Sequence, residues 1–348
     1  MTQQVGVAII GSGYWGVNHV RVFNELPDAR VVAICDQNYE RLQEVGRRFQ
    51  QVTLTTELDD VLQMPGVDAV VVCTGATSHY AIARRSLLAG KHVLVEKPLT
   101  TGVAEGEELV ELAAMRGLIL MVGHTFLYNA GVRKIKEYIS LGDVGQVYYL
   151  YATRTNLGPI RTDVSALWDL APHDISIFNY LLDSLPVWVS AVGMRVLRNS
   201  RDDVGFISLG YPNGVVGHIH VSWANPNKVR EVVVVGSNER IVFDDISTTE
   251  RVRVFEKGVT SVEREASSFG EHQLLMRDGA IIIPKIEASE PLKNECAHFL
   301  ECVLTGCQPL TSGREGVEVV QVMEAIDRSV AAHGAPVVLE YRHRQLVS

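Results

Sequence analysis

The chain has 348 residues, and its 32 Lys and Arg against 41 Asp and Glu give a formal net charge of −9. At about 150 residues per domain the length suggests two domains, and a hydrophobic content of 47% fits a sizeable core. The acidic balance argues against a nucleic-acid-binding protein, and no apolar run reaches the roughly 18–20 residues that span a bilayer. The N-terminus lacks the basic region of a signal peptide, and five scattered cysteines do not make a disulfide framework. We therefore expect a soluble cytoplasmic protein.

The first 123 residues alternate between two kinds of segment. Short β-branched runs without polar alternation predict strands that are buried on both faces, at residues 5–10, 30–35, 68–73, 92–95 and 118–122. Helix-length segments lie between them, at residues 15–26, 39–50, 78–89 and 103–115. This alternation predicts an α/β fold, with a doubly wound parallel sheet of the Rossmann type over residues 1–123.

The pattern changes over residues 124–348. A helix is predicted at residues 132–141, followed by strand-like runs at 146–155, 187–196, 204–211, 215–223, 231–235 and 251–255, several of which alternate polar and apolar residues. The segment Tyr211-Pro212-Asn213-Gly214 predicts a hairpin turn between two of these strands. Amphipathic helices follow at residues 292–304, ending at Gly306, and at residues 319–330. The second domain is therefore expected to be α+β, with a mainly antiparallel sheet.

A glycine-rich turn, Gly11-Ser12-Gly13-Tyr14-Trp15-Gly16, joins the first predicted strand to the first helix. In such a turn the first glycine permits the tight bend, the second lets the backbone approach a pyrophosphate, and the third allows close helix packing. The helix N-terminus then presents free N–H groups to the phosphates. Asp36 ends the second strand, where a carboxylate binds ribose hydroxyls and repels a 2′-phosphate. No arginine directly follows Asp36, so the sequence predicts NAD rather than NADP.

Polar residues also follow the strands predicted at residues 68–73 and 92–95, at the sheet edge where open α/β folds bind ligands. Thr74-Gly75 follows the first of these strands, and Glu96-Lys97-Pro98 follows the second. Pro98 restricts Lys97 to extended conformations, which can hold the lysine at the rim of a site. A surface lysine in a turn is the alternative interpretation.

Residues 90–99, Gly-Lys-His-Val-Leu-Val-Glu-Lys-Pro-Leu, resemble the signature of the glucose–fructose oxidoreductase/inositol dehydrogenase/MocA (Gfo/Idh/MocA) family. The resemblance covers nearly the whole chain, including the glycine-rich turn, the Thr74 to His79 segment, Gly123-His124 with Asn129, and a closing pattern from residue 291 to 310. It implies NAD binding by residues 11–16 and Asp36, together with Thr74, His79, Glu96 and Lys97. It also implies that Lys97 is catalytic or orients the substrate, and that an open-faced sheet in the C-terminal domain supports homodimers or homotetramers.

The resemblance implies a second catalytic element, an Asp-x-x-x-His pair that Asp169 and His173 match. Positions i and i+4 of a helix share one face, about 5–6 Å apart at Cβ, so the carboxylate can orient the imidazole. Histidine suits the role of accepting the hydroxyl proton as hydride leaves the carbinol carbon. Because Pro172 fits a helix only in its first turn, Asp169 can alternatively be a helix cap.

The segment Arg154 to Asp163, ahead of residues 167–174, resembles the branch of the family that oxidises C3 of UDP-N-acetylglucosamine or its uronic acid ahead of transamination. Arg154 and Arg161 can supply positive charge for a diphosphate or carboxylate, and Asn156 a hydrogen bond, alongside Lys97, His124 and His173. Surface arginines are the alternative. For the function, the alternatives are a free-sugar or inositol dehydrogenase, a ketosugar reductase that uses NAD(P)H, and an NAD-binding sensor without turnover.

Two groups of residues resemble metal ligands but lack a complete set. His218 and His220 alternate on a predicted strand without an evident third ligand, and core packing explains the cluster Cys296, His298, Cys302 and Cys307 better than zinc. Cys73 is expected to be an inert buried residue. The sequence thus predicts no metal, and a small-molecule sugar as the partner.

Overall fold

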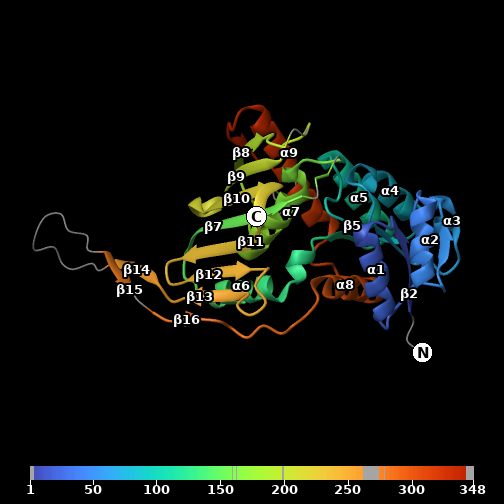
Figure 1. Cartoon of the computed structure of the whole chain (residues 1–348), viewed down its shortest axis with the longest axis horizontal. Helices are drawn as coiled ribbons and strands as arrows, with labels where there is room; N and C mark the ends of the chain where they lie inside the picture. Colours follow the sequence, from blue (N-terminus) through green and yellow to red (C-terminus); the bar gives the residue numbers. More distant parts are fainter. Residues whose placement is uncertain are drawn as a thin grey trace, which may run out of the picture. The chain divides into compact units, whose positions relative to one another are not determined.

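The computed structural model describes residues 4–158, 160–161, 163–197, 200–261, 274–277 and 279–341. The chain forms two compact units (Figure 1). Unit 1 comprises Met1–Tyr128 and Ser289–Glu324, and unit 2 comprises Asn129–Ala288 and Ala325–Ser348. The sequence suggested a single division at residues 123/124, whereas in the structure residues 289–324 return to the N-terminal unit. They return because α8 (Pro291–Thr305) carries an apolar stripe that packs against α1 (Tyr14–Glu25) and β1 (Val5–Ile10).

Unit 1 contains a six-stranded parallel sheet in the order β3-β2-β1-β4-β5-β6. Besides β1, its strands are β2 (Ala29–Cys35), β3 (Thr53–Thr55), β4 (Ala69–Val72), β5 (His92–Glu96) and β6 (Leu120–Gly123). The further helical segments are α2 (Tyr39–Arg48), α3 (Leu58–Gln63), η1 (Ala76–Ser78), α4 (His79–Leu88), α5 (Val103–Arg116) and η2 (Thr125–Tyr128). The boundary between the units falls inside α9 (Gly313–Ala331).

The strand order and the burial of this sheet confirm the predicted doubly wound fold. Every residue of β1, β4 and β6 is buried, as expected for strands that are covered on both faces. The sequence analysis did not predict β3 and α3. The three residues of β3 are exposed or half-buried, so this edge strand has no apolar run that would reveal it.

Unit 2 is built on a nine-stranded mixed sheet in the order β16-β13-β12-β11-β7-β10-β9-β8-β17. Only β7 and β10 pair in parallel among these described strands. The strands are β7 (Val147–Leu157), β8 (Trp188–Met194), β9 (Val204–Gly210), β10 (Val216–Ser222), β11 (Ala224–Gly236), β12 (Arg240–Asp244), β13 (Val252–Phe255), β16 (Ile281–Ile282) and β17 (Val337–Val338). A separate ribbon pairs β14 (Gly258–Ser261) with β15 (Leu274–Arg277). The predicted hairpin turn is confirmed as η3 (Pro212–Gly214) between β9 and β10.

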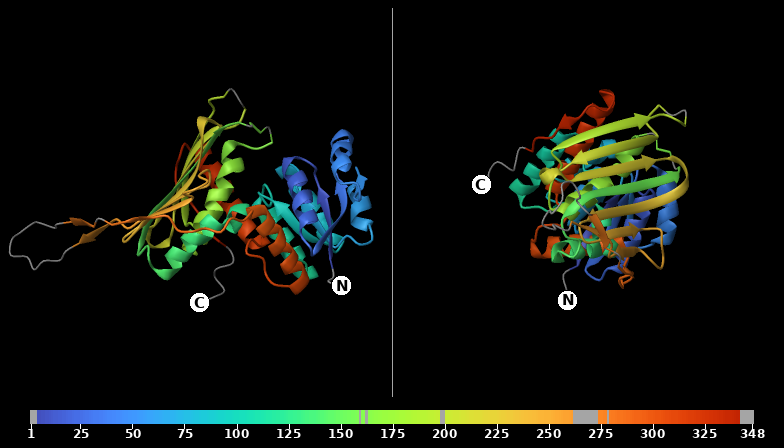
Figure 2. Two further views of the ribbon diagram at one scale, coloured as in Figure 1. Left: turned by 60° about the horizontal axis from the view of Figure 1, so that its bottom comes forward. Right: turned by 90° about the vertical axis from the view of Figure 1, so that its left-hand side faces the viewer.

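One face of the nine-stranded sheet packs against helices α6 (Ala130–Leu141) and α7 (Ala166–Leu182) (Figure 2). The opposite face carries no helix in the right-hand view of Figure 2. Apolar side chains lie on it with 36–50% of their surface exposed, among them Tyr149, Val192, Met194 and Phe206. The sheet is therefore open-faced, as predicted. Among the described residues, no helix combines the length and apolar character required to cross a membrane.

Candidate functional site

The glycine-rich turn between β1 and α1 has the geometry that a bound pyrophosphate requires. Gly11 has a φ of +93°, and a Cβ on Gly16 would lie 1.8 Å from the Gly11 carbonyl oxygen, so both positions exclude a side chain. A Cβ on Gly13 would meet nothing within 4 Å. Gly13 is the N-cap of α1 and no side chain caps this helix, so its first N–H groups face the open space. The turn therefore fits the diphosphate of NAD.

Asp36 is fixed by the same turn. Its Oδ2 accepts hydrogen bonds from the Ser12 backbone N–H at 2.7 Å and the Ser12 hydroxyl at 2.8 Å, and its Oδ1 accepts one from the Asn38 N–H at 2.8 Å. Burial acts to raise the pKa of Asp36, but these hydrogen bonds outweigh it and lower the pKa below its usual value. The sequence analysis overlooked Arg41, whose Nη1 lies 3.5 Å from Asp36 Oδ2. The carboxylate is thus ionised and held at the end of β2, where it fits a ribose.

His79 links the two strand ends that follow β4 and β5. Its Nδ1 lies 2.7 Å from the Pro98 carbonyl oxygen, its Nε2 lies 3.1 Å from the Thr74 carbonyl oxygen, and the residue is 1% exposed. The hydroxyls of Thr74 and Ser78 are 2.7 Å apart. The sequence analysis expected His79 to contact the cofactor. Because both ring nitrogens contact backbone oxygens, the geometry instead favours a positioning role for His79.

Glu96 and Lys97 lie at the carboxyl end of β5 and are only 8% and 9% exposed. Glu96 Oε1 lies 2.9 Å from Nε2 of His19, which is fully buried on α1. The other ring nitrogen of His19 lies 3.5 Å from the Cys296 thiol of α8. The sequence analysis did not single out His19. Its signal was a histidine on the buried face of an otherwise apolar amphipathic helix, a position where an imidazole needs a polar partner.

Two further ionisable groups are buried near Glu96. Burial first, and then the charge of Glu96, raise the pKa of Glu295 well above its usual range, which favours the neutral acid. Burial first, and then the charge of Lys97, lower the pKa of His124 to about 4. Within the described part of unit 1, neither ring nitrogen of His124 has a hydrogen-bond partner. Lys97 therefore lies beside an imidazole whose neutral form is favoured, and Glu96, its neighbour in the chain, lies near Glu295.

Helix α7 positions the predicted Asp169/His173 pair. The Ser165 side chain caps the helix by accepting a hydrogen bond from the Trp168 N–H at 3.3 Å. Asp169 lies in the first turn, and Pro172 lies inside the helix. The alternative interpretation of Asp169 as the cap is therefore wrong, and so is the expectation that Pro172 fits only a first turn. Asp169 and His173 are separated by one helical turn on the same face.

Arg161 holds Asp169 from the preceding loop. Its Nη1 donates to Asp169 Oδ1 at 3.0 Å, while its Nε and Nη2 donate to Asp163 at 2.9 and 2.6 Å. The Arg161 side chain as a whole remains 32% exposed. The structure thus assigns Arg161 a contact with the predicted catalytic carboxylate, which the sequence analysis did not anticipate. Pro159 and Thr162 of this segment lie outside the described residues.

Arg154 requires a correction. It was expected to bind an anionic substrate group, or to lie on a surface loop. It lies on β7, is 4% exposed, and donates through Nε and Nη2 to both oxygens of Asp174, at 2.9 and 2.7 Å. Asp174 is itself 1% exposed, so this bidentate pair is a structural element of unit 2 and not an anion site. Asn156 donates to the Gly158 carbonyl oxygen.

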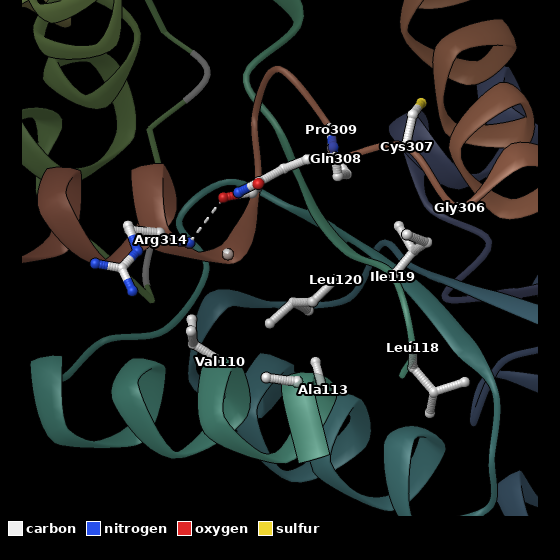
Figure 3. A pocket seen from close by; sticks show the side chains of 13 residues that line it. Val110, Ala113, Leu118, Ile119, Leu120, Gly306, Cys307, Gln308, Pro309 and Arg314 are labelled. Atoms are coloured by element: carbon white, nitrogen blue, oxygen red, sulfur yellow. Dashed lines mark hydrogen bonds between the residues drawn. The ribbon is translucent and has the colours of Figure 1, made fainter. Parts of the chain in front are cut away.

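The described residues contain no group of three or more side chains that could hold a metal ion. His220 stacks on Phe206 at 4.5 Å between ring centroids, and His218 lies 3.4 Å from the Ser208 hydroxyl. A cavity of about 340 Å³ lies between α5 and the loop before α9 (Figure 3). Its lining is largely apolar and includes none of the predicted site residues.

Comparisons with known proteins agree with this geometry. The model of the oxidoreductase family with an NAD-binding Rossmann fold (GFO_IDH_MocA) matches residues 5–124, and the GFO/IDH/MocA C-terminal domain model matches residues 132–242. The NAD(+)-dependent scyllo-inositol 2-dehydrogenase of Bacillus subtilis is 27% identical over 98% of each chain. The UDP-N-acetylglucosamine 3-dehydrogenase of Acidithiobacillus ferrooxidans is 25% identical over 92% of this chain and 96% of the relative.

Among solved structures, the WlbA dehydrogenase of Bordetella pertussis in complex with NADH and UDP-GlcNAcA aligns with a TM-score of 0.79. The alignment covers 97% of this chain and all of the other, at 23% identity, and so shows a shared fold. Together with the matches of both domain models, the glycine-rich turn and the strand-end lysine lead to one assignment. The chain belongs to the Gfo/Idh/MocA family and is an NAD-dependent oxidoreductase.

Proposed function

We propose that the protein oxidises a secondary hydroxyl group of a sugar, with C3 of a UDP-linked N-acetylhexosamine as the position of attack. The observation that carries the proposal is Lys97, an ammonium group at the carboxyl end of β5 with only 9% exposure. A buried ammonium in this position can donate to a hydroxyl oxygen and stabilise the negative charge that develops there. NAD supplies the acceptor for the hydride when it is bound.

The remaining steps fall to the residues of α7. We assign His173 as the general base that accepts the hydroxyl proton through its ring. Asp169, one helical turn earlier, orients that ring and favours its protonated form. Arg161 holds Asp169 in place through its contact at 3.0 Å, so that Asp169 keeps its orientation during the reaction. In unit 1, the neutral His124 adds no positive charge beside Lys97.

Two observations support a nucleotide sugar as the substrate. The Acidithiobacillus ferrooxidans relative is named for UDP-N-acetylglucosamine, and the Bordetella pertussis structure holds a UDP-sugar acid. Arg161 uses three of its five N–H groups in the contacts to Asp163 and Asp169. The exposed remainder of the guanidinium can therefore donate to a carboxylate or a phosphate.

A free inositol or sugar is a second candidate. It is favoured by the burial of Arg154 against Asp174, which removes one of the two cations expected to bind a diphosphate. The Bacillus subtilis relative, an inositol dehydrogenase, has an identity similar to that of the UDP-sugar enzyme.

The test is NADH formation, measured by absorbance, with NAD and a panel of UDP-sugars, myo- and scyllo-inositol and free glucose. The same panel is repeated with 2-oxoglutarate, in case bound NADH must be reoxidised before a second turnover. Turnover with UDP-N-acetylglucosamine or its uronic acid, with a 3-keto product, supports the proposal. Turnover with inositol alone selects the second candidate. Silence with every substrate, despite NAD binding, contradicts both and favours a ketosugar reductase or a sensor.

We also propose that the open face of the nine-stranded sheet joins copies of the chain into a dimer or tetramer. The exposed apolar side chains on that face, Tyr149, Val192 and Phe206 among them, would be covered by such an association. Sedimentation of the wild type and of Phe206→Glu tests this. A wild type that sediments as a monomer contradicts the proposal.

A further inference from the structure

We propose that Cys302 and Cys307 form a reversible disulfide site that a hydroperoxide oxidises and a dithiol reduces. The two sulfur atoms lie 3.3 Å apart, with the Cys307 thiol donating to Cys302. Cys307 is exposed, whereas Cys302 is fully buried on the last turn of α8. The pair is separate from the residues that the proposed function uses, and its chemistry does not depend on that function.

The turn at the end of α8 brings the two cysteines together. Gly306 has a φ of +75° and donates its N–H to the Cys302 carbonyl oxygen at 2.8 Å, which reverses the chain directly after the helix. Cys307 therefore folds back over the turn that carries Cys302. A disulfide needs a sulfur separation of about 2.05 Å, so the sulfur atoms must approach by about 1.3 Å. Rotation of the exposed Cys307 side chain can supply a movement of this size.

A histidine and a glutamate complete the site. His298 Nε2 lies 3.5 Å from the Cys302 sulfur and accepts the Leu310 backbone N–H at 3.1 Å. Because Nε2 accepts a hydrogen bond, the ring hydrogen of neutral His298 lies on Nδ1, which donates to Glu301 Oε2 at 3.1 Å. The single lone pair of Nε2 is thus shared between the Leu310 N–H and the Cys302 thiol, so His298 acts as the base for Cys302 when the Leu310 contact opens, with Glu301 orienting the ring. Burial first, and then the hydrogen bond with Cys307, raise the pKa of Cys302 to about 12, so its attack on another sulfur requires such a base.

The reaction has two steps. The exposed Cys307 sulfur attacks the hydroperoxide, forming an S–O bond and breaking the O–O bond, and an alcohol (water, for hydrogen peroxide) leaves with the thiol proton. The Cys302 sulfur then attacks Cys307, forming the S–S bond and breaking the S–O bond. His298 passes the Cys302 proton to the departing hydroxide, which leaves as water. Two thiols lose two electrons in total, and the peroxide gains them.

Cys307 also lines the cavity of about 340 Å³ between α5 and residues 306–314 (Figure 3), and its exposed side chain leaves the thiol open to a small peroxide. Cys296, the other cysteine of α8, is fully buried and contacts His19 instead. The cluster that the sequence grouped together is thus two separate arrangements. Cys296 is expected to take no part in the oxidation.

The experiment treats the full-length protein with hydrogen peroxide at neutral pH, alkylates the remaining thiols, and cleaves after Glu, Lys and Arg. The fragment from Cys302 to Arg314 then contains only these two cysteines. We expect this fragment to be unalkylated and two hydrogens lighter than the dithiol, and to regain both thiols with dithiothreitol. Cys35, 4% exposed, serves as the internal control that stays alkylated.

Variants test the assigned roles. In Cys302→Ser, dimedone is expected to trap a sulfenic acid on Cys307, while in Cys307→Ser the Cys302 thiol should survive peroxide. His298→Gln should slow closure of the disulfide by about 100-fold and lengthen the life of the sulfenic acid. A wild-type fragment that keeps both thiols, gains oxygen without losing two hydrogens, or joins two chains overturns the proposal. Because these readouts are made on the wild type, they stand even where a variant fails to fold.

Discussion

The glycine-rich turn of unit 1 and helix α7 of unit 2 each fix an acidic side chain, but they do so by different means. Asp36 is held by the N–H and hydroxyl of Ser12, in a turn whose shape the glycines dictate, and by the Asn38 N–H two residues further along the chain. Asp169 is held by Arg161, a long side chain from a loop with no periodic pattern. Backbone donors are placed by the fold itself, whereas a guanidinium loses rotamer freedom in order to stay in place. The first arrangement is therefore encoded by spacing, and the second by a particular pair of residues.

The largest effect is expected from Lys97→Ala, in unit 1. Because its ammonium lies at the end of β5 where charge is proposed to develop, we expect kcat to fall by about 10³-fold, equivalent to ~4 kcal/mol. NAD affinity, measured by fluorescence titration, should change far less. Lys91→Ala is the matched control, since Lys91 donates to the Val67 carbonyl oxygen and should leave turnover unchanged. Equal losses in NAD affinity and kcat would contradict a role in the chemical step.

Within unit 2, Arg154→Ala tests a side-chain pair that is buried rather than exposed. It leaves the Asp174 carboxylate, 1% exposed, without its bidentate partner, and should lower the free energy of unfolding by about 3–5 kcal/mol in urea. Arg195→Ala is the control, because the Arg195 side chain is 62% exposed and its pair with Asp202 is worth at most about 1 kcal/mol. A stable Arg154→Ala protein that has lost activity would return Arg154 to the substrate site.

The pH dependence of stability tests the buried cluster around Lys97. The pKa of His124 is about 4 in the folded protein and 6.5 ordinarily, so the unfolded chain takes up a proton first as the pH falls. Stability from this residue is complete above pH 6.5 and declines toward pH 4, by about 2 kcal/mol between pH 7.5 and pH 5. Urea unfolding of wild type and His124→Asn at both pH values measures this difference. An equal change in the free energy of unfolding between the two pH values in both proteins would show that His124 takes up a proton normally.

Substitutions of two glycines in the glycine-rich turn between β1 and α1 separate the effect on cofactor binding from the effect on folding. Gly13→Ala adds a Cβ to open space, so the fold should keep its stability while NAD affinity falls about tenfold, or 1.4 kcal/mol. Gly16→Ala instead places a Cβ 1.8 Å from the Gly11 carbonyl oxygen and should cost about 1–3 kcal/mol of stability. Thermal unfolding measures the stability of both variants, and NAD titration measures their affinity for the cofactor. Unchanged NAD binding by Gly13→Ala would mean that the pyrophosphate lies elsewhere.

The smallest expected effect belongs to Arg161→Lys, which keeps the charge but loses the forked contacts to Asp163 and Asp169. If Arg161 acts through Asp169, kcat should fall about fivefold with little change in KM, because the orientation of His173 loosens. Steady-state kinetics with the substrate found in the panel measure both constants. A rise in KM alone would instead make Arg161 a direct contact of the substrate.

The contrast between the two arrangements also explains what the sequence could predict. The doubly wound sheet, the turn at residues 11–16, Asp36 and the strand-end lysine follow from periods and spacings that are local in the chain. The contacts of Glu96 with His19 and of His19 with Cys296 join three distant segments. Arg154 and Arg161 were grouped by proximity in sequence, but one faces the interior of unit 2 from β7 and the other lies on a loop. Side-chain partners from distant segments leave no periodic signal, and these were the features missed or misassigned.

Unit 1 is built from two segments that are distant in the chain, and this has a consequence for its folding during synthesis. About 160 residues separate Tyr128 from Ser289, the two points between which the chain leaves that unit. At roughly 5–20 residues per second, a ribosome needs about 8–30 s to make this stretch. During that time β1 and α1 have emerged without α8, so the apolar surface that α8 covers is exposed on the nascent chain. Chaperones therefore have a defined interval, and a defined surface, on which to act before the nucleotide-binding unit can close.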